Sequence, residues 1–184
     1  MAYSFASSSD DIEAAAYICR KTGNVYWDSS GLDYHLHVFR LSEKNGTTEN
    51  VIGIPDDEFP TATPTLAGWE TRIVDHFYEV GITAEYEYDF GDGWLHKVTL
   101  EGILLGDADS QYPLCIEGER ACPAEDCGGV PGYYRLLDAL SVPDNDEYKE
   151  LMDWLGKDYD PDKFTPQEIE FDDPKARWES AFSR

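Results

Sequence analysis

Residues 86–133 read YEYDFGDGWLHKVTLEGILLGDADSQYPLCIEGERACPAEDCGGVPGY, and this stretch decides the fold of the chain. Its first residues alternate aromatic with acidic side chains, which is typical of a strand with one buried face. Gly91-Asp92-Gly93 then provides the backbone freedom of a tight turn, and an apolar return segment follows. The stretch therefore predicts a β-hairpin over residues 83–105, followed by a long cysteine-containing loop over residues 106–132.

The sequence on both sides of this hairpin predicts further strands and helices. They are a helix from Asp10 to Gly23, strands at 34–41 and 51–54 joined by Asn45-Gly46, a short helix at 69–80, three helices near Tyr133, Asp144 and Asp173, and a single turn at 165–168. Hairpins alternating with separate helices predict an α+β fold, with an antiparallel sheet built from hairpins and helices packed on it. We expect residues 1–9 to be a loose polar leader and residues 10–184 to form a single domain.

The charge of the chain excludes some classes of partner. Against 14 Lys and Arg there are 38 Asp and Glu, which gives a net charge of −24. Direct binding to nucleic acid or to an anionic membrane requires clustered basic residues, and the sequence has no such cluster. We therefore expect no direct nucleic-acid or membrane partner, and an unknown protein or small molecule instead. The acidity itself favours solubility, and the alternative is an acidic face for a basic partner.

The sequence also indicates a compartment. It contains no apolar run long enough to span a bilayer, and its start, MAYSFASSSDD, lacks the pattern of a signal peptide. We therefore expect a cytoplasmic protein whose cysteines are reduced thiols, metal ligands or redox groups rather than disulfides.

Three of the four cysteines, Cys115, Cys122 and Cys127, lie in the long loop. Zinc prefers four sulfur and nitrogen ligands, so a zinc site here would need a fourth ligand, for which His96 is the candidate. The spacings are not those of a short zinc knuckle. We therefore expect the three thiols to come together and brace the loop, with no metal and no cofactor.

Polar and aromatic residues around the hairpin turn form a candidate site. Asp89, Asp92 and His96 could perform acid–base or metal chemistry, whereas an aspartate between glycines also stabilises a turn by itself. His35 and His37 share one strand face with Phe39, as pocket lining or strand surface. The resulting candidate binding surface consists of Tyr86, Tyr88, Asp89, Asp92, Trp94, His96, His35 and His37.

Several uncommon sequence motifs, in a characteristic order, indicate a resemblance to a known family. YEYDFGDGW, YPLCIEG, ACPAEDCGGVPGYYRLLDAL and DWLGKDYDPDKF, with HLHVF at 35–39, resemble the plasmid pRiA4b ORF-3-like family over roughly residues 34–165. The resemblance implies an α+β domain, often encoded near mobile elements, without an established activity. Similar proteins usually begin with an extra strand, which we expect to be absent here. The hairpin of residues 34–41 and 51–54 should then lie near a sheet edge, covered by residues 1–9 or 55–66 or paired with a second copy of the chain.

We expect this protein to be a non-catalytic, cytoplasmic binding or interaction domain rather than an enzyme. The alternative is a metal-dependent hydrolase or nuclease that uses Cys, His and Asp ligands around residues 89–127. Metal analysis of the purified protein separates the two readings.

Overall fold

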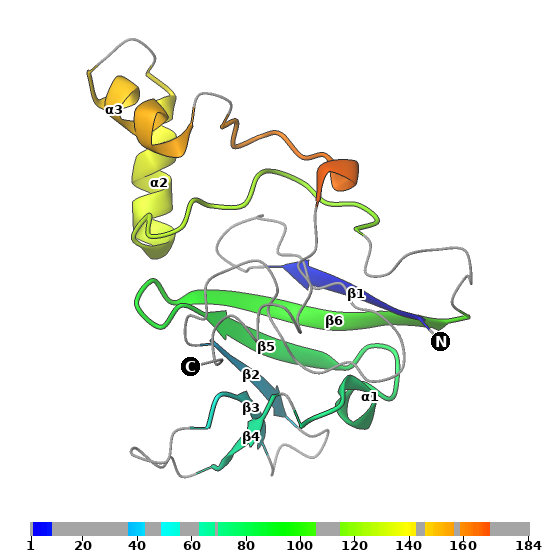
Figure 1. Cartoon of the computed structure of the whole chain (residues 1–184). Helices are drawn as coiled ribbons and strands as arrows, with labels where there is room; N and C mark the ends of the chain where they lie inside the picture. The colour runs from blue at the N-terminus through cyan, green and yellow to red at the C-terminus, as the bar shows by residue number, and fades with distance from the viewer. Residues whose placement is uncertain are drawn as a thin grey trace, which may run out of the picture.

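The computed structural model describes residues 2–8, 37–42, 49–55, 63–68, 70–105, 115–142, 146–156 and 159–169. Its centre is a six-stranded sheet in the order β1-β6-β5-β2-β3-β4 (Figure 1). The strands are β1 (Ala2–Ser8), β2 (His37–Ser42), β3 (Glu49–Gly53), β4 (Thr65–Ala67), β5 (Thr83–Tyr88) and β6 (Trp94–Leu104). Neighbouring strands are antiparallel except β3 and β4, which are parallel.

The helices lie at the ends of this sheet. They are α1 (Ile73–His76), α2 (Gly129–Leu140), α3 (Asp146–Leu155) and the 3-10 turn η1 (Pro166–Glu168). Figure 1 shows α2 rising from the end of the sheet that holds the β5–β6 turn, with α3 beside α2 and away from the strands. The molecule is therefore an α+β protein, as the sequence predicts. No helix in the described ranges is long and apolar enough to cross a membrane.

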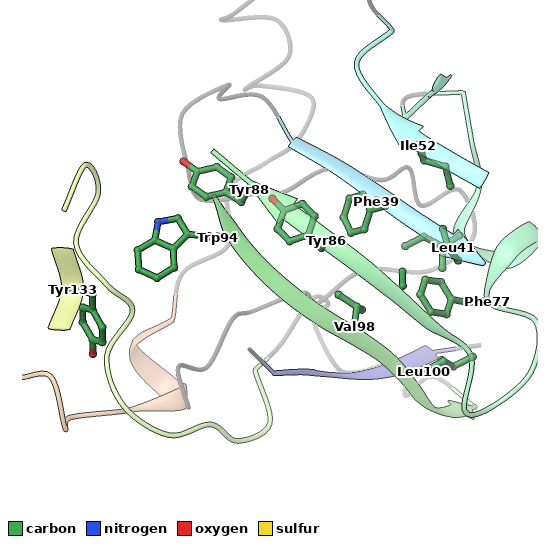
Figure 2. Close-up of a cluster of buried hydrophobic side chains, with 12 residues drawn as sticks. Phe39, Leu41, Ile52, Phe77, Tyr86, Tyr88, Trp94, Val98, Leu100 and Tyr133 are labelled. Atoms are coloured by element: carbon green, nitrogen blue, oxygen red, sulfur yellow. The ribbon is translucent and has the colours of Figure 1, made fainter. Parts of the chain in front are cut away.

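The core lies on one face of the sheet because side chains alternate along each strand. Phe39 of β2 pairs with Tyr86 of β5, which pairs with His96 of β6, so these rings stand in one row across three strands. Apolar residues extend this face on both sides, and α1 and α2 each contribute to it. The buried cluster drawn in Figure 2 contains Phe39, Leu41, Ile52, Ile73, Phe77, Ala84, Tyr86, Tyr88, Trp94, Val98, Leu100 and Tyr133.

The N-terminal segment differs from the prediction. Residues 2–8 form β1, paired antiparallel with β6 from Ala2↔Leu104 to Ser8↔Lys97, so the prediction of a loose leader is wrong. The chain also begins with a strand, which corrects the expectation that a leading strand is absent. The physical reason is that a strand takes its hydrogen bonds from its neighbour, and the alternation of Tyr3 and Phe5 with small residues suits pairing with β6.

The edge beside β3 is covered within the chain. Residues of β4 pair with it from Val51↔Thr65 to Gly53↔Ala67. Of the alternatives for this edge, the structure therefore shows a covering that involves the end of the 55–66 segment. A three-residue edge strand leaves few unpaired backbone groups for another chain.

Most other predicted elements in the described ranges are present. The hairpin at 83–105 is confirmed as β5 and β6, and α3 and η1 lie where the sequence places them. The helix boundaries differ: α1 spans Ile73–His76 rather than residues 69–80, and α2 begins at Gly129 rather than near Tyr133. Gly128 and Gly129 both have positive φ, so they reverse the chain just where the helix starts. The predicted elements near Asp10, Asn45-Gly46 and Asp173 lie outside the described residues.

Candidate functional site

The β5–β6 turn is fixed by the backbone and side chain of Asp89. Its φ is 52°, and its Oδ1 accepts a hydrogen bond from Gly91 N at 2.8 Å. The Asp89 carbonyl oxygen accepts a second hydrogen bond from Gly93 N at 2.6 Å. Asp89 therefore stabilises the turn, as aspartate often does when it bonds to the backbone two residues on.

The start of α2 docks on this turn through a side-chain hydrogen bond and close backbone contacts. Asp92 Oδ2 accepts a hydrogen bond from Gly128 N at 3.2 Å. A Cβ at Gly129 would meet the carbonyl oxygen of Asp92, and a Cβ at Gly132 would meet the carbonyl oxygen of Cys127. Gly129 and Gly132 are thus required because backbone passes too close for any side chain, whereas Gly128 is favoured by its positive φ of 89°.

A side-chain contact joins the same hairpin to the cysteine loop. Tyr88 Oη donates a hydrogen bond to Glu125 Oε2 at 3.2 Å. Burial, and then the Glu125 carboxylate, raise the pKa of Tyr88 well above its usual range. The edge of Trp94 meets the Tyr133 ring at a centroid distance of 6.4 Å, and Figure 2 shows Tyr88 and Trp94 at the hairpin end facing α2. We call residues 88–94, 122–129 and Tyr133 together the turn–helix junction.

Residues 159–164, which follow α3, run antiparallel to residues 118–122 of the cysteine loop (Figure 1). Ala121 N donates to the Pro161 carbonyl oxygen at 3.0 Å, and Tyr159 Oη donates to the Cys122 carbonyl oxygen at 3.3 Å. Farther along, Gly118 lies against the Phe164 ring. Residues 118–122 and 159–164 therefore support each other.

Cys122 and Cys127 interact electrostatically, and the pKa values of both thiols are shifted. The pKa of the Cys122 thiol is raised to about 11 by burial, then by Glu125 and Cys127. The pKa of the Cys127 thiol is also raised to about 11, by burial, Asp92 and Glu125. Cys115 instead donates its hydrogen bond within its own stretch, to the Glu117 carbonyl oxygen at 3.6 Å. Cys115, Cys122 and Cys127 are all free thiols rather than disulfide partners.

The candidate zinc ligands predicted from the sequence can be placed in the structure. Within the described ranges, no three His, Cys, Asp or Glu side chains are arranged to hold a metal ion. His96, the candidate fourth zinc ligand, contacts the Tyr86 ring at 5.7 Å rather than a thiol.

The histidines belong to the ring row on the sheet. His37 lies 6.4 Å from Phe39 and 6.2 Å from Tyr86, and the Phe39 and Tyr86 rings stack at 4.4 Å. The Nδ1 atom of His96 is buried and has no hydrogen-bond partner among the described residues. Burial lowers the pKa of His96 to about 4, so the ring is neutral at pH 7.

The sequence-based site residues therefore fall in different environments. Tyr86, Tyr88 and Trp94 are buried, at 5%, 3% and 8% exposure. Asp89 and Asp92 bond to the backbone of the turn and of α2, while His37 is half-buried and His35 lies outside the described residues. Sequence reasoning missed Glu125, Tyr133, Tyr159 and the paired glycines. The motifs EDCGG and PGY were the available signal for these residues, because adjacent glycines before a helix indicate that another backbone segment approaches closely.

Comparisons with known proteins cover this same region. A family model described as plasmid pRiA4b ORF-3-like protein matches residues 27–168, which include the whole turn–helix junction. The uncharacterized protein y4hQ of Sinorhizobium fredii (strain NBRC 101917 / NGR234) is 29% identical over 148 residues, 78% of this chain and 72% of that protein. The crystal structure of MM3350, a protein of unknown function from Methanosarcina mazei Go1, has a TM-score of 0.65 and 37% identity, covering 76% of this chain and 75% of that one.

Proposed function

This chain belongs to the plasmid pRiA4b ORF-3-like family, and we propose that it is a non-catalytic binding or interaction domain acting in the cytoplasm. The proposal rests on the hydrogen bonds that the polar groups of the turn–helix junction make within the protein. Tyr88 is bonded to Glu125, Asp92 to the backbone of Gly128, and Asp89 to the backbone of Gly91. Groups engaged in this way hold the fold together rather than face a substrate.

The titration behaviour of the junction supports the same proposal. A cysteine nucleophile reacts as the thiolate, which requires a lowered pKa. Here the pKa values of Cys122 and Cys127 are raised to about 11, so both thiols are protonated at neutral pH. Free thiols at Cys115, Cys122 and Cys127 support a reducing compartment such as the cytoplasm.

Two measurements test the non-catalytic half of the proposal. Elemental analysis of the purified protein should show less than one metal ion for every ten chains. Hydrolysis of phosphodiester and ester substrates, with added Zn²⁺ or Mn²⁺, should not exceed that of a Cys122→Ser/Cys127→Ser variant. Stoichiometric metal, or turnover that this variant abolishes, would establish the hydrolase alternative instead.

A separate measurement tests the binding half. Cross-linking of the tagged chain in its native cells, followed by mass spectrometry, should yield one recurring partner whose cross-links concentrate on one surface. The matched control is an unrelated acidic protein of similar size and net charge, expressed at the same level. Cross-links spread over abundant proteins, equally for both chains, would refute a binding role.

A further inference from the structure

Helix α3 has no fully buried side chain among its described residues. Among the helices and strands described, the one on which it packs is α2. Its apolar stripe, Tyr148, Leu151, Met152 and Leu155, has helical spacing but is only partly buried. Trp154 lies beside this stripe and is 52% exposed, and Figure 1 shows the helix away from the sheet. Tryptophan is among the residue types that are enriched at protein–protein contact sites.

Carboxylates surround the exposed indole. Glu150 lies one helical turn before Trp154 and Asp153 directly precedes it, and both are exposed. Neither has an ion-pair partner among the described residues, whereas Lys149 pairs with Asp146 at 3.3 Å. The surface around Trp154 therefore combines an exposed aromatic ring with two exposed carboxylates.

The outer side of α2 continues the same composition. Tyr134, Asp138 and Val142 follow one another at intervals of four residues, so they share a side of the helix and its C-terminal extension. Tyr134 is 51% exposed and Val142 is 54% exposed. Aromatic, apolar and acidic groups thus recur on both helices of the pair.

We propose that the Trp154 face of α3, with Glu150 and Asp153, docks an arginine-containing basic segment of a partner protein. A guanidinium binds over the face of a tryptophan ring, and adjacent carboxylates bind its N–H groups. The net charge of −24 adds long-range attraction for a basic segment and repulsion for nucleic acid and anionic lipid. This inference rests on the proposed binding function and names the chemistry of the partner.

Fluorescence anisotropy with labelled nona-arginine tests the docking face, with nona-glutamate as the probe of opposite charge. Trp154→Ala and Glu150→Gln/Asp153→Asn should each weaken nona-arginine binding by about tenfold. Two controls match these changes elsewhere on the surface. Leu105→Ala truncates an apolar side chain that is 92% exposed, and Glu101→Gln/Glu119→Gln removes the same charge from other exposed sites. Both controls should stay within about twofold of the wild type.

Circular dichroism of every variant shows whether α3 remains folded, and the charge variant keeps the test valid if Trp154→Ala loses helix. Equal loss of affinity in test and control variants, or no binding of nona-arginine, would overturn the proposal. A recurring cross-linked partner combined with such a result would leave the binding function intact and refute only the α3 face. Absence of any recurring partner would refute the binding function itself.

Discussion

At the scale of single residues, the glycines at the turn–helix junction show how strictly the chain is constrained. Gly129 has a φ of +64°, and a side chain there would collide with the backbone of Asp92. Gly93 has a similar φ of +68°, yet open space surrounds the position of its missing Cβ. The two residues therefore share a backbone conformation and differ in what lies next to them.

Gly129→Ala should consequently destabilise the protein far more than Gly93→Ala. The conformational strain, about 1 kcal/mol, is common to both, and the clash with immobile backbone adds at least about 2 kcal/mol at Gly129. Urea denaturation of the two variants measures the difference in the free energy of unfolding. Equal losses would show that α2 does not rest on the turn as described.

His96 predicts a pH dependence at the same scale. Its pKa falls from 6.5 to about 4 on folding, so the unfolded chain binds a proton that the folded chain does not between these values. The free energy of unfolding is therefore unaffected by titration of His96 above pH 6.5. It decreases as the pH falls from 6.5 toward 4, with about 2 kcal/mol lost by pH 5. His96→Phe keeps a ring beside Tyr86 and removes this loss.

The measurement for His96 is the free energy of unfolding of wild type and variant in urea at several pH values from 7.5 to 4.5. As the pH falls, the free energy of unfolding should decrease less for His96→Phe than for the wild type. The carboxylates titrate equally in both proteins, so they cancel in this difference. Parallel curves would contradict the buried, neutral state of His96.

At the scale of elements, the structure couples the β5–β6 hairpin to the cysteine loop through Tyr88 and Glu125. The two residues are 37 positions apart and are bonded at 3.2 Å. The loop in turn is held by residues 159–164 on its other side, through Pro161 and Tyr159. Three segments distant in sequence therefore stabilise one another.

A double-mutant cycle with Tyr88→Phe and Glu125→Gln should report a coupling energy of about 1 kcal/mol. A hydrogen bond to a charged group contributes about 1.5–3 kcal/mol, and the neutral amide oxygen of glutamine still accepts a weaker one. Denaturation midpoints with unchanged slopes supply the four free energies. The control cycle replaces Glu125→Gln with Asp126→Asn, at an exposed neighbouring carboxylate, and should give a coupling near zero. Equal coupling in both cycles would assign the effect to general charge rather than to this hydrogen bond.

At the scale of the whole molecule, the surplus of 38 acidic over 14 basic residues governs stability as well as partnership. Bringing like charges together on folding opposes the compact state, and dissolved salt screens this repulsion. The free energy of unfolding should therefore rise by about 1 kcal/mol or more between 20 and 500 mM NaCl at pH 7.5. The same titration at pH 5 is the control, because partial protonation of the carboxylates should reduce the increase. Stability that falls with added salt would contradict the argument.

The sequence by itself determined the elements whose patterns are local. Alternation from Ala84 to Tyr88 and the glycines of the turn specify the hairpin, because strand period and turn chemistry need only adjacent residues. The apolar spacing from Tyr148 to Leu155 specifies α3 in the same way. The family resemblance also follows from sequence alone, since it depends on the order of sequence motifs along the chain.

Only the tertiary structure decided what depends on contacts between distant residues. Residues 2–8 are a strand because β6 offers them hydrogen bonds, and nothing near them in sequence requires it. The candidate surface residues Tyr88 and Trp94 are buried because Glu125 and Tyr133 reach them from the loop and from α2. A local pattern tells which residues share a face, but whether another segment covers that face is set by packing across the whole chain.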